Sequence, residues 1–454
     1  MKSNQNALIK SNQELLLEVQ EILKNYSIQN IDSFLSNLHP SEISDLLESM
    51  ESSNRNELFG RLDAKKKGDV LSELSVSIRA DLLDSVDPEG FVNDTSGLEP
   101  DDLADIIQDL PEPMADQVLL SMDAQNRERV AESLNYPPDT AGGLMNVDVL
   151  TVRADVEVDV VLRFLRRFGP IPENQNQLFV VDRSDKLLGS VLLLDLLMAE
   201  PEVFISEIMQ KVNTPINALT NDREVTLIFE RYDLIEAPVV TEEHKFLGFI
   251  SVDDVVDVLR EETDRSLLSS AGLATDYDMF APILKTSGMR SVWLAANLAT
   301  AFLAAGVIGL FETTIEAMVA LAVLMPVVAS MGGIAGTQTL TIVVRGLSIG
   351  QVGAANSKSV LFREIVIGFF NGCLWAMVVA FISSLWFENI GLGVIIAIAM
   401  IVNLVTAGFF GAMIPLTLDK FDIDPALAGG VIVTTITDVV GFFAFLGLAN
   451  YYLV

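Results

Sequence analysis

Asp438 is the residue whose type and position most clearly predict chemistry. It is the single carboxylate in "VIVTTITDVVGFFAFLG", residues 431–447, a stretch otherwise apolar enough to cross a membrane. An ionised carboxylate facing lipid at mid-depth costs roughly 3 kcal/mol or more, so this side chain is expected to face protein or a water-filled path. Thr434, Thr435 and Thr437 add hydroxyl groups beside it. Cation binding is the functional prediction, and a hydrogen bond to a neighbouring helix is the structural alternative.

A glycine-rich segment, "LMPVVASMGGIAGTQTLTIVVRG" at residues 324–346, is the second candidate for contact with ions. Pro326 has no N–H to donate within a helix, and Gly332, Gly333 and Gly336 loosen the helix further. Backbone carbonyls freed at such a break must not face lipid, so the segment is expected to line a cavity and meet the water shell of a cation. Close packing between helices is the alternative use of these glycines.

The third group is a row of acidic side chains in "VDDVVDVLREETDRSLLSS", residues 252–270. Asp254, Asp257, Glu261 and Asp264 follow one another at three- and four-residue intervals, which places them on one face of a helix. Like charges on one face repel, and divalent cations would relieve that repulsion and draw separate acidic domains together. A solvated acidic face is the alternative.

The charge distribution divides the chain into an acidic half and a membrane half. Residues 1–270 carry 23 Lys and Arg against 52 Asp and Glu, whereas residues 271–454 carry 6 against 10. Half of all residues are apolar, and the mean hydropathy is +0.41. The N-terminal sequence has no apolar run long enough for a secretory signal, so the soluble half is expected in the cytoplasm.

Several chemistries are not expected from this composition. Cys373, the single cysteine, lies in an apolar segment without a partner in the chain, which is typical of a small buried residue in a reducing cell. His39 and His244 are far apart with no cysteine near either, so a zinc site is not expected. The phosphate-binding loop GxxxxGK[ST] is missing, which argues against an ATP-driven pump. No enzymatic activity is expected.

The soluble half is expected to contain an acidic, all-α N domain at residues 31–138, after an N-terminal helix or tail at residues 1–30. Its short helices repeat an apolar pair beside an acidic residue, at irregular intervals that suit a compact helical superhelix. The phrase reads "ISDLLES" at 43–49, "RADLLDS" at 79–85 and "LADIIQD" at 103–109. Prolines and glycines in "NYPPDTAGGLM", residues 135–145, then indicate a domain boundary.

Two similar α/β units follow, at residues 139–203 and 204–258. Each has an apolar strand, a polar turn, a second strand, and an aspartate that opens a helix six residues past a glycine. The two units resemble a tandem cystathionine β-synthase-type (CBS) pair, a family whose paired modules usually sense ligands. Ser251 and Asp254 form the S-x-x-D arrangement by which many members hold an adenine nucleotide, whereas the first unit has Leu192 at the hydroxyl position. The pair is therefore a candidate adenine-nucleotide site.

Residues 252–284 are expected to form a connecting helix, and residues 285–454 a transmembrane domain of five helices. The apolar stretches lie at about 290–311, 315–344, 361–387, 390–416 and 427–453. Each is long enough to cross about 30 Å of hydrocarbon at 1.5 Å per residue. Lys and Arg residues lie before the first span and after the second and fourth. This distribution predicts a multi-pass protein of the cytoplasmic (inner) membrane, with the N-terminus cytoplasmic and the C-terminus outside.

The expected fold class is multidomain: an all-α helical superhelix, an α/β tandem CBS pair and an α-helical polytopic membrane domain. This combination resembles the MgtE magnesium channels over nearly the whole chain, through "YPPDTAGGLM", the CBS pair, "MPVVASMGGIAGTQTLTIVVRG" and "DPALAGGVIVTTITDVVG". The resemblance implies a homodimer with a Mg²⁺ pathway between subunits, in which Asp438 binds the ion. The pore-lining candidates are Gly332, Gly333, Gly336, Thr434 and Thr437.

The resemblance also implies that the N domain and the CBS pair close the channel when internal Mg²⁺ is high. The acidic residues that match the family's sensing sites are Asp101, Asp102, Asp105, Asp233, Asp254, Asp257, Glu261 and Glu262. Two departures bear on this expectation. Ile334 stands where the family usually has an asparagine, so a polar amide is missing from the pathway. Arg265 and Ser266 stand where an acidic pair is usual, which is expected to weaken inhibition by Mg²⁺.

The sequence therefore predicts a Mg²⁺-gated Mg²⁺ channel that moves ions down their electrochemical gradient. Mg²⁺ prefers octahedral oxygen coordination and gives up water reluctantly, so one carboxylate per subunit with carbonyls and hydroxyls suits a hydrated ion. The expected partners are divalent cations, the lipid bilayer and a second copy of the chain, with no nucleic acid. Two alternatives are a secondary transporter of Co²⁺ or Ni²⁺, in which Asp438 exchanges a proton or sodium ion, and a membrane ion or nucleotide sensor that transports nothing.

Overall fold

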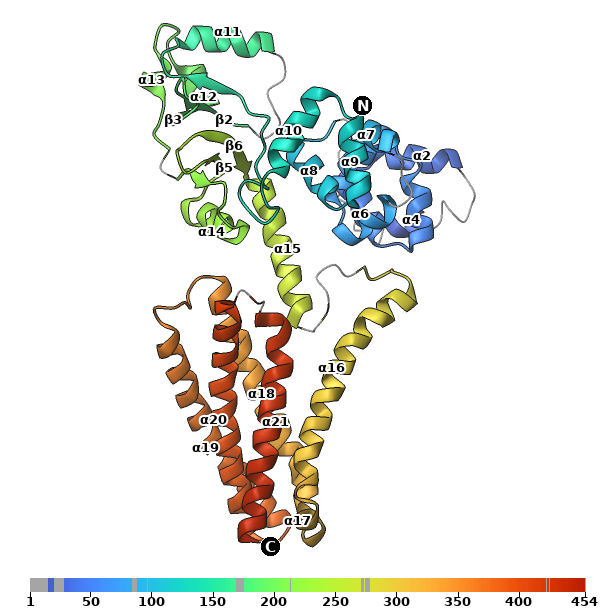
Figure 1. Ribbon diagram of the computed structural model, residues 1–454, viewed down its shortest axis with the longest axis vertical. Coiled ribbons are helices and arrows are strands. Elements are labelled where there is room, and N and C mark those ends of the chain that lie inside the picture. Colours follow the sequence, from blue (N-terminus) through green and yellow to red (C-terminus); the bar gives the residue numbers. More distant parts are fainter. Residues whose placement is uncertain are drawn as a thin grey trace, which may run out of the picture. The chain divides into compact units, whose positions relative to one another are not determined.

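The computed structural model describes residues 15–19, 28–83, 88–95, 97–168, 175–212, 214–270, 273, 278–421, 423 and 425–453. The chain forms two compact units (Figure 1). Unit 1 comprises Met1–Glu262 with Asp276–Ala281, and unit 2 comprises Thr263–Thr275 with Pro282–Val454. Of the predicted N-terminal helix or tail, residues 1–30, only 15–19 and 28–30 lie within the described residues.

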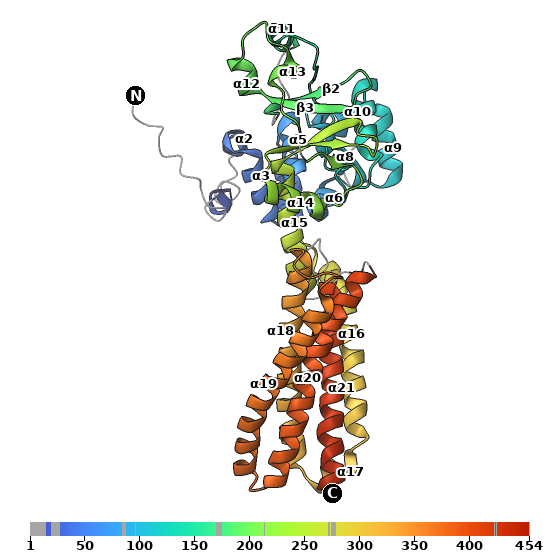
Figure 2. The same cartoon turned by 90° about the vertical axis from the view of Figure 1, so that its left-hand side faces the viewer.

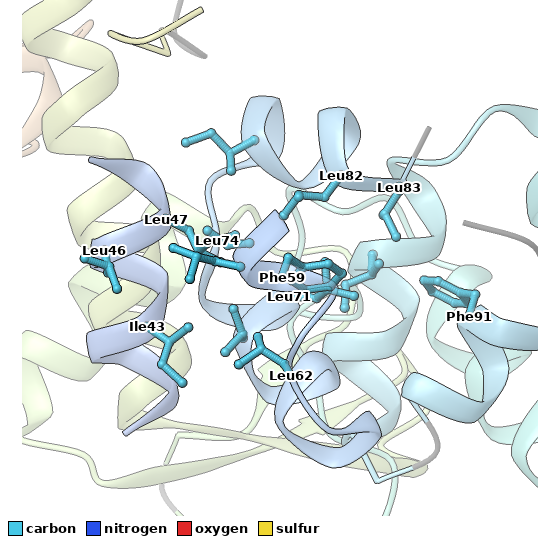
Figure 3. Close-up of a cluster of buried hydrophobic side chains, with 14 of the residues drawn as sticks. Ile43, Leu46, Leu47, Phe59, Leu62, Leu71, Leu74, Leu82, Leu83 and Phe91 are labelled. Carbon is cyan, nitrogen blue, oxygen red and sulfur yellow. The ribbon is translucent and has the colours of Figure 1, made fainter. Parts of the chain in front are cut away.

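The first part of unit 1 is a helical N domain, as predicted. Its helices are α2 (Ile28–Asn37), α3 (Pro40–Glu48), α4 (Ser52–Phe59), α5 (Ala64–Glu73), α6 (Val76–Leu83), α7 (Pro88–Asp94), α8 (Pro100–Gln108), α9 (Glu112–Ser121) and α10 (Ala124–Leu134). The apolar pairs of the repeated phrase explain how these short helices hold together. Leu46 and Leu47 of α3 and Leu82 and Leu83 of α6 all lie in one buried cluster (Figure 3). Each helix buries its apolar face against its neighbours, which stabilises helices too short to form alone.

A buried arginine joins distant parts of unit 1. Arg55 on α4 is 0% exposed. It donates to the carbonyl of Leu47, in the last turn of α3, at 3.1 Å and to that of Met50, just after α3, at 2.9 Å. Its Nη1 lies 3.0 Å from the carboxylate of Asp278 and 3.6 Å from that of Asp81. A buried guanidinium without a charged partner is costly. The carboxylate of Asp278, the nearer of the two, offsets much of that cost.

The second part of unit 1 contains two small sheets with the same topology, which confirms the predicted CBS pair. The strands are β1 (Thr151–Arg153), β2 (Gln177–Val181), β3 (Leu187–Leu192), β4 (Ile216–Asn217), β5 (Glu236–Val240) and β6 (Phe246–Ser251). The helices are α11 (Val158–Phe168), α12 (Leu193–Met198), α13 (Ile205–Ile208) and α14 (Asp222–Tyr232). In each sheet the central strand pairs parallel with the first strand and antiparallel with the third.

The two sheets are joined through equivalent turns. Asp185 and His244 each adopt a left-handed backbone conformation, with φ of 60° and 64°. The Phe246 N–H donates to the Asp185 carbonyl at 2.8 Å, and the Leu187 N–H donates to the His244 carbonyl at 3.1 Å. The ring centroids of Phe179 and Phe246 lie 5.1 Å apart beneath this junction. These reciprocal hydrogen bonds and the ring contact hold the two CBS units together.

Helix α15 (Val252–Ser270) follows directly from β6. An ion pair holds α15 to α14: Arg223 of α14 contacts both carboxylate oxygens of Glu262 of α15 at 2.7 Å. The segment predicted as a connecting helix, residues 252–284, contains α15 and the start of the next helix, α16, at Ile283.

Among its described residues, unit 2 contains five helices long and apolar enough to cross a membrane, as predicted. They belong to α16 (Ile283–Gly309), α18 (Ala320–Ser348), α19 (Ser357–Trp386), α20 (Ile390–Lys420) and α21 (Pro425–Tyr452), and the short helix α17 (Glu312–Ala317) follows the first. Figures 1 and 2 show α18 to α21 running side by side. Helix α20 contacts α18, α19 and α21, and 50% of its apolar stretch is buried, against 6% for α16. Helix α20 is therefore the core of the bundle.

The expected break in the second span is not observed, because α18 is helical throughout Ala320–Ser348 with Pro326 inside it. The glycines serve close packing instead. A side chain at Gly332 would collide with Asn403 of α20, and one at Gly336 with Val433 of α21. The proline removes one helical hydrogen bond, and tight contacts with two neighbouring helices keep the rest of the helix on its path.

Candidate cation pathway and acidic cluster

A groove on unit 2 carries the candidate cation pathway. It has a volume of about 850 Å³ and is lined by one face of α18 and by two residues of α21. The lining residues are Ala329, Ser330, Gly333, Ile334, Thr337, Gln338, Thr341, Ile342, Thr434 and Asp438. The α18 residues recur at three- and four-residue spacing, so a single helix face supplies most of the wall.

The threonine hydroxyls of the groove are oriented as acceptors. The Thr337 hydroxyl donates to the Gly333 carbonyl, and the Thr341 hydroxyl to the Thr337 carbonyl, both at 2.9 Å. On α21 the Thr434 hydroxyl donates to the Gly430 carbonyl at 2.9 Å. Because each hydroxyl proton is used within its own helix, the oxygen lone pairs are left to accept hydrogen bonds. The water molecules around a hydrated cation are donors, so this wall suits a cation that keeps its waters.

Asp438 supplies the negative charge of the groove. It lies nine residues after Gly429 and fourteen before Tyr452, the ends of the fifth candidate span. Its side chain is half-buried, and among the described residues no group donates a hydrogen bond to it. A carboxylate in this position faces the groove rather than a dry contact between helices, so it is available to a cation.

The other predicted pore-lining residues divide into two sets. Gly333 and Thr434 line the groove. Gly332 and Gly336 pack behind it, and Thr437 is fully buried with its hydroxyl donating to the Thr434 carbonyl at 2.9 Å. These buried residues shape the wall from the side away from the groove.

A cluster of carboxylates lies between α8 and α15 within unit 1. Helix α8 begins after Glu99, and Asp101 and Asp102 lie in its first turn, where the helix dipole favours negative charge. From α15, Asp253 and Asp254 act electrostatically on the α8 carboxylates, as does Glu261 on Asp105. Asp257 acts on Asp102. We call these eight residues, Glu99, Asp101, Asp102, Asp105, Asp253, Asp254, Asp257 and Glu261, the acidic cluster.

Several carboxyl groups of the acidic cluster have raised pKa values. Burial, followed by the charges of Asp102 and Asp254, raises the pKa of Glu99 to about 7. Burial also raises the pKa of Asp102 to about 6, although the guanidinium of Arg79 opposes the shift. For Asp101, burial and then the charge of Asp254 hold the pKa well above its usual range. The positive groups near these carboxylates are therefore too few to offset their burial and their mutual repulsion.

Asp254 is both part of this cluster and part of the S-x-x-D arrangement. Its carboxylate accepts hydrogen bonds from the Ser251 hydroxyl at 2.6 Å and the Ser251 N–H at 3.0 Å. Burial nevertheless raises the pKa of Asp254 to about 7, because these bonds only partly offset the loss of solvent. The Ser251 hydroxyl also contacts the carboxylate of Asp253.

The donor set of the acidic cluster fits a hydrated Mg²⁺ ion. All the donors are hard carboxylate oxygens, and the buried Oδ1 of Asp101 has no hydrogen-bond partner in the ranges that the structure describes. Among the described residues, no group of three or more His, Cys, Asp or Glu side chains is arranged to enclose a bare ion. Mg²⁺ usually keeps several waters and uses one or two carboxylates, so the cluster suits binding through those waters.

Two predicted sensing residues, Asp233 and Glu262, lie outside the acidic cluster, and Asp105 lies at its exposed side. Asp233 ends α14 with a left-handed backbone, φ 50°, and its side chain is exposed. Glu262 is engaged by Arg223. Asp105 is exposed on α8 and lies near Arg79, whose guanidinium pairs with Asp109 at 2.8 Å.

We expect the packing of α8 against α15 to weaken as pH rises when Mg²⁺ is absent. The folded-state pKa values of Glu99, Asp102 and Asp254 lie above their ordinary values near 4, so the stabilisation is fully present below about pH 4 and is lost through about pH 6 to 7. Hydrogen exchange of α8 and α15 in the full chain, corrected for intrinsic rates, measures this. Millimolar Mg²⁺ at pH 8 should restore protection that Na⁺ at equal ionic strength does not. Equal protection at pH 8 with and without Mg²⁺ would contradict the expectation.

Several polar residues of the membrane unit were not predicted. Ser330 and Gln338 line the groove. Glu364 on α19 is buried and accepts a hydrogen bond from the Thr339 hydroxyl at 3.2 Å, and Asn403 on α20 is fully buried. Of these, Asn403 had a signal in the sequence: it is a lone polar side chain in an apolar run, the same signal that singled out Asp438.

Comparison with known proteins agrees with this architecture. Residues 325–448 match a family described as a divalent cation transporter, MgtE. Residues 38–139 match the MgtE intracellular N domain, and residues 141–202 and 205–261 match CBS domains. The matches and the five candidate spans define the class as multi-pass membrane proteins with a CBS-containing soluble region.

Individual relatives identify the family. The chain is 31% identical over 353 residues to the magnesium transporter MgtE of Bacillus subtilis, covering 78% of each chain. It is 30% identical over 357 residues to the magnesium transporter MgtE of Thermus thermophilus, covering 77% of this chain and 79% of that one. A crystal structure described as the cytosolic domain of the Mg²⁺ channel MgtE in complex with ATP matches with a TM-score of 0.50 and 31% identity, over 54% of this chain and 99% of that one. The chain belongs to the MgtE family.

Proposed function

We propose that the protein is a Mg²⁺ channel that imports Mg²⁺ down its electrochemical gradient and is closed by cytoplasmic Mg²⁺. The observation that carries the proposal is the groove, in which one carboxylate, Asp438, lies among hydroxyl oxygens that are free to accept hydrogen bonds. A hydrated Mg²⁺ ion is held there through its waters, loosely enough to leave again. The names of the relatives in Bacillus and Thermus support Mg²⁺ as the ion.

The conducting form in this proposal is a homodimer. The groove is open on one side, and its polar wall with Asp438 is costly to expose to lipid. A second copy related by a two-fold axis covers the groove and sets two Asp438 carboxylates across one path. The negative field is then doubled without a closed cage that would trap the ion. Ile334, 56% exposed in the groove, contributes an apolar surface where an amide would bind water.

Closure in this proposal uses the acidic cluster. At low internal Mg²⁺ the carboxylates of α8 and α15 repel one another, and at high internal Mg²⁺ bound ions hold the two helices together. The regulatory ligands proposed are Asp101, Asp102, Asp105, Asp254, Asp257 and Glu261. Glu262 and Asp233, which lie outside the acidic cluster, contribute further negative charge. An adenine nucleotide at the CBS pair, as in the ATP complex named for the similar cytosolic domain, is a second proposed regulator.

The proposed topology places the soluble half in the cytoplasm and the C-terminus outside, in the cytoplasmic membrane. The distribution of Lys and Arg around the spans supports it. The function proposed requires no enzymatic step.

A flux experiment tests the channel. In proteoliposomes with a fixed inside-negative voltage, Mg²⁺ influx is expected to follow the voltage and the Mg²⁺ gradient, and to be unchanged when a proton or sodium gradient is imposed. A several-fold increase with a proton gradient at the same voltage would instead identify a secondary transporter, with Co²⁺ and Ni²⁺ as further substrates to compare. No flux in either condition, with the soluble half still binding Mg²⁺ or nucleotide, would identify a sensor that transports nothing.

A further inference from the structure

Asn403 lies where three membrane helices meet, behind the wall of the groove. Its side chain comes from α20, the core of the bundle, and is 0% exposed. The amide Nδ2 donates to the Val328 carbonyl of α18 at 2.8 Å. This bond joins two helices through residues that are 75 positions apart in the sequence.

Two glycines make room for this amide. A Cβ atom at Gly332 of α18 would collide with Asn403 Nδ2, and one at Gly441 of α21 would lie 2.7 Å from the same atom. The same added atom at Gly441 would also approach Val328 at 3.1 Å. The amide therefore fills a space that both groove-lining helices leave open, and it touches each of them.

The Oδ1 atom of Asn403 is buried and has no hydrogen-bond partner within the described part of the chain. An apolar side chain of similar size would fill the space without leaving a polar atom unpaired in the membrane. What the amide adds is a directional bond to α18, which fixes the rotation of that helix as well as its distance from α21.

The residues of the groove lie close to these contacts along both helices. Ser330 is two residues after Val328, and Gly333 directly follows Gly332. Asp438 is three residues before Gly441 on α21. A change in the spacing or rotation of α18 against α21 at Asn403 must therefore move the hydroxyl face relative to the carboxylate.

We infer that Asn403 is the positioning residue of the cation pathway: it sets how the hydroxyl face of α18 stands opposite Asp438. The inference rests on the proposed function, since it takes the groove as the ion path. Asn403 does not touch the ion, and acts through the helices that do.

The test uses size exchange at the contact. In proteoliposomes of the full chain, Gly441→Ala is expected to raise the Mg²⁺ concentration for half-maximal flux about tenfold, because the new methyl group pushes on the amide. Combining it with Asn403→Ala vacates that space but also removes the donor to Val328, so Gly441→Ala should add less than about twofold to the value of Asn403→Ala alone. Gly447→Ala is the matched control on the same helix, where the nearest atom to an added Cβ is 3.8 Å away.

A second variant separates volume from the directional bond. Asn403→Leu keeps the space filled but removes the donor, and should raise the half-maximal concentration and alter the ratio of Mg²⁺ to Co²⁺ flux, at an unchanged amount of folded protein. A purely structural role would lower that amount and leave both flux properties of the remaining protein unchanged.

The outcomes distinguish this inference from the proposed function. If Gly441→Ala behaves like Gly447→Ala, or if it has the same tenfold effect when residue 403 is already alanine, the positioning role is wrong even when Asp438→Asn abolishes flux. If Asp438→Asn leaves flux intact, the groove is not the path and both proposals fall. Should Asn403→Leu fail to fold, the glycine pair decides the question alone.

Discussion

Replacing Asp438 with asparagine is expected to lower Mg²⁺ flux by about a hundredfold or more, since about 3 kcal/mol of lost attraction suffices for that change. Asparagine keeps the size of the side chain and its acceptor oxygen, so the groove should keep its shape while losing its charge. In a dimer both carboxylates disappear together, which enlarges the effect. Flux into proteoliposomes under a fixed voltage, and growth of a Mg²⁺-starved host, both measure it.

The control for this experiment is Asp419→Asn. Asp419 is an exposed carboxylate in the last turn of α20 and does not line the groove. Its replacement removes one charge from the same unit and should change flux less than about twofold, as expected of an exposed charge screened by salt. Equal effects of the two substitutions would mean that general charge, and not the carboxylate in the groove, governs conduction.

Neutralising the acidic cluster is expected to raise the internal Mg²⁺ concentration that closes the channel by about tenfold, a change equivalent to about 1.4 kcal/mol of ion binding. The variant is Asp101→Asn, Asp102→Asn, Asp254→Asn and Asp257→Asn together, two residues from each helix. Amides of the same size cannot supply the charge that attracts Mg²⁺, so the dependence of closure on Mg²⁺ should also become less steep. Patch recordings with varied internal Mg²⁺ give the closing concentration.

The matched control changes the same number of charges elsewhere on the CBS pair. Glu200, Glu202, Glu230 and Glu242 are exposed and lie outside the acidic cluster. Their replacement by glutamine should leave the closing concentration within about twofold, since screened surface charges contribute little. A cluster variant that stayed closed without Mg²⁺ would contradict the expectation, because relief of repulsion alone would then close the channel.

Local sequence signals predicted much of the fold and part of the candidate pathway. The five apolar runs, the repeated α/β units and the apolar pairs of the N domain are local patterns within one or two neighbouring elements, so they could be recognised without tertiary information. Asp438 stood out because an acid in an apolar span is costly. Ser330 and Gln338 are at helical spacing from Gly333 and Ile334, and extending that spacing along α18 would have found them.

The predictions that failed, or were not made, depended on contacts between distant segments. The loosening expected at Pro326 did not become a break, because packing against α20 and α21 outweighs a local preference. Gly332 was considered for the pore lining, yet it makes room for Asn403, 71 positions further along the chain. The spacing of acidic residues on α15 likewise carried no information about which carboxylates of α8 they would meet.

The ion pair between Arg55 and Asp278 holds the short segment that precedes α16 against the N domain. Along the backbone, the N domain reaches the first span only through the CBS pair and α15. Asp278 is five residues before α16 begins at Ile283, and it is held by a guanidinium buried in the N domain. Only residues 279–282 separate this ion pair from the first residue of α16, so the last segment of unit 1 is anchored to the N domain immediately before the chain enters its first span.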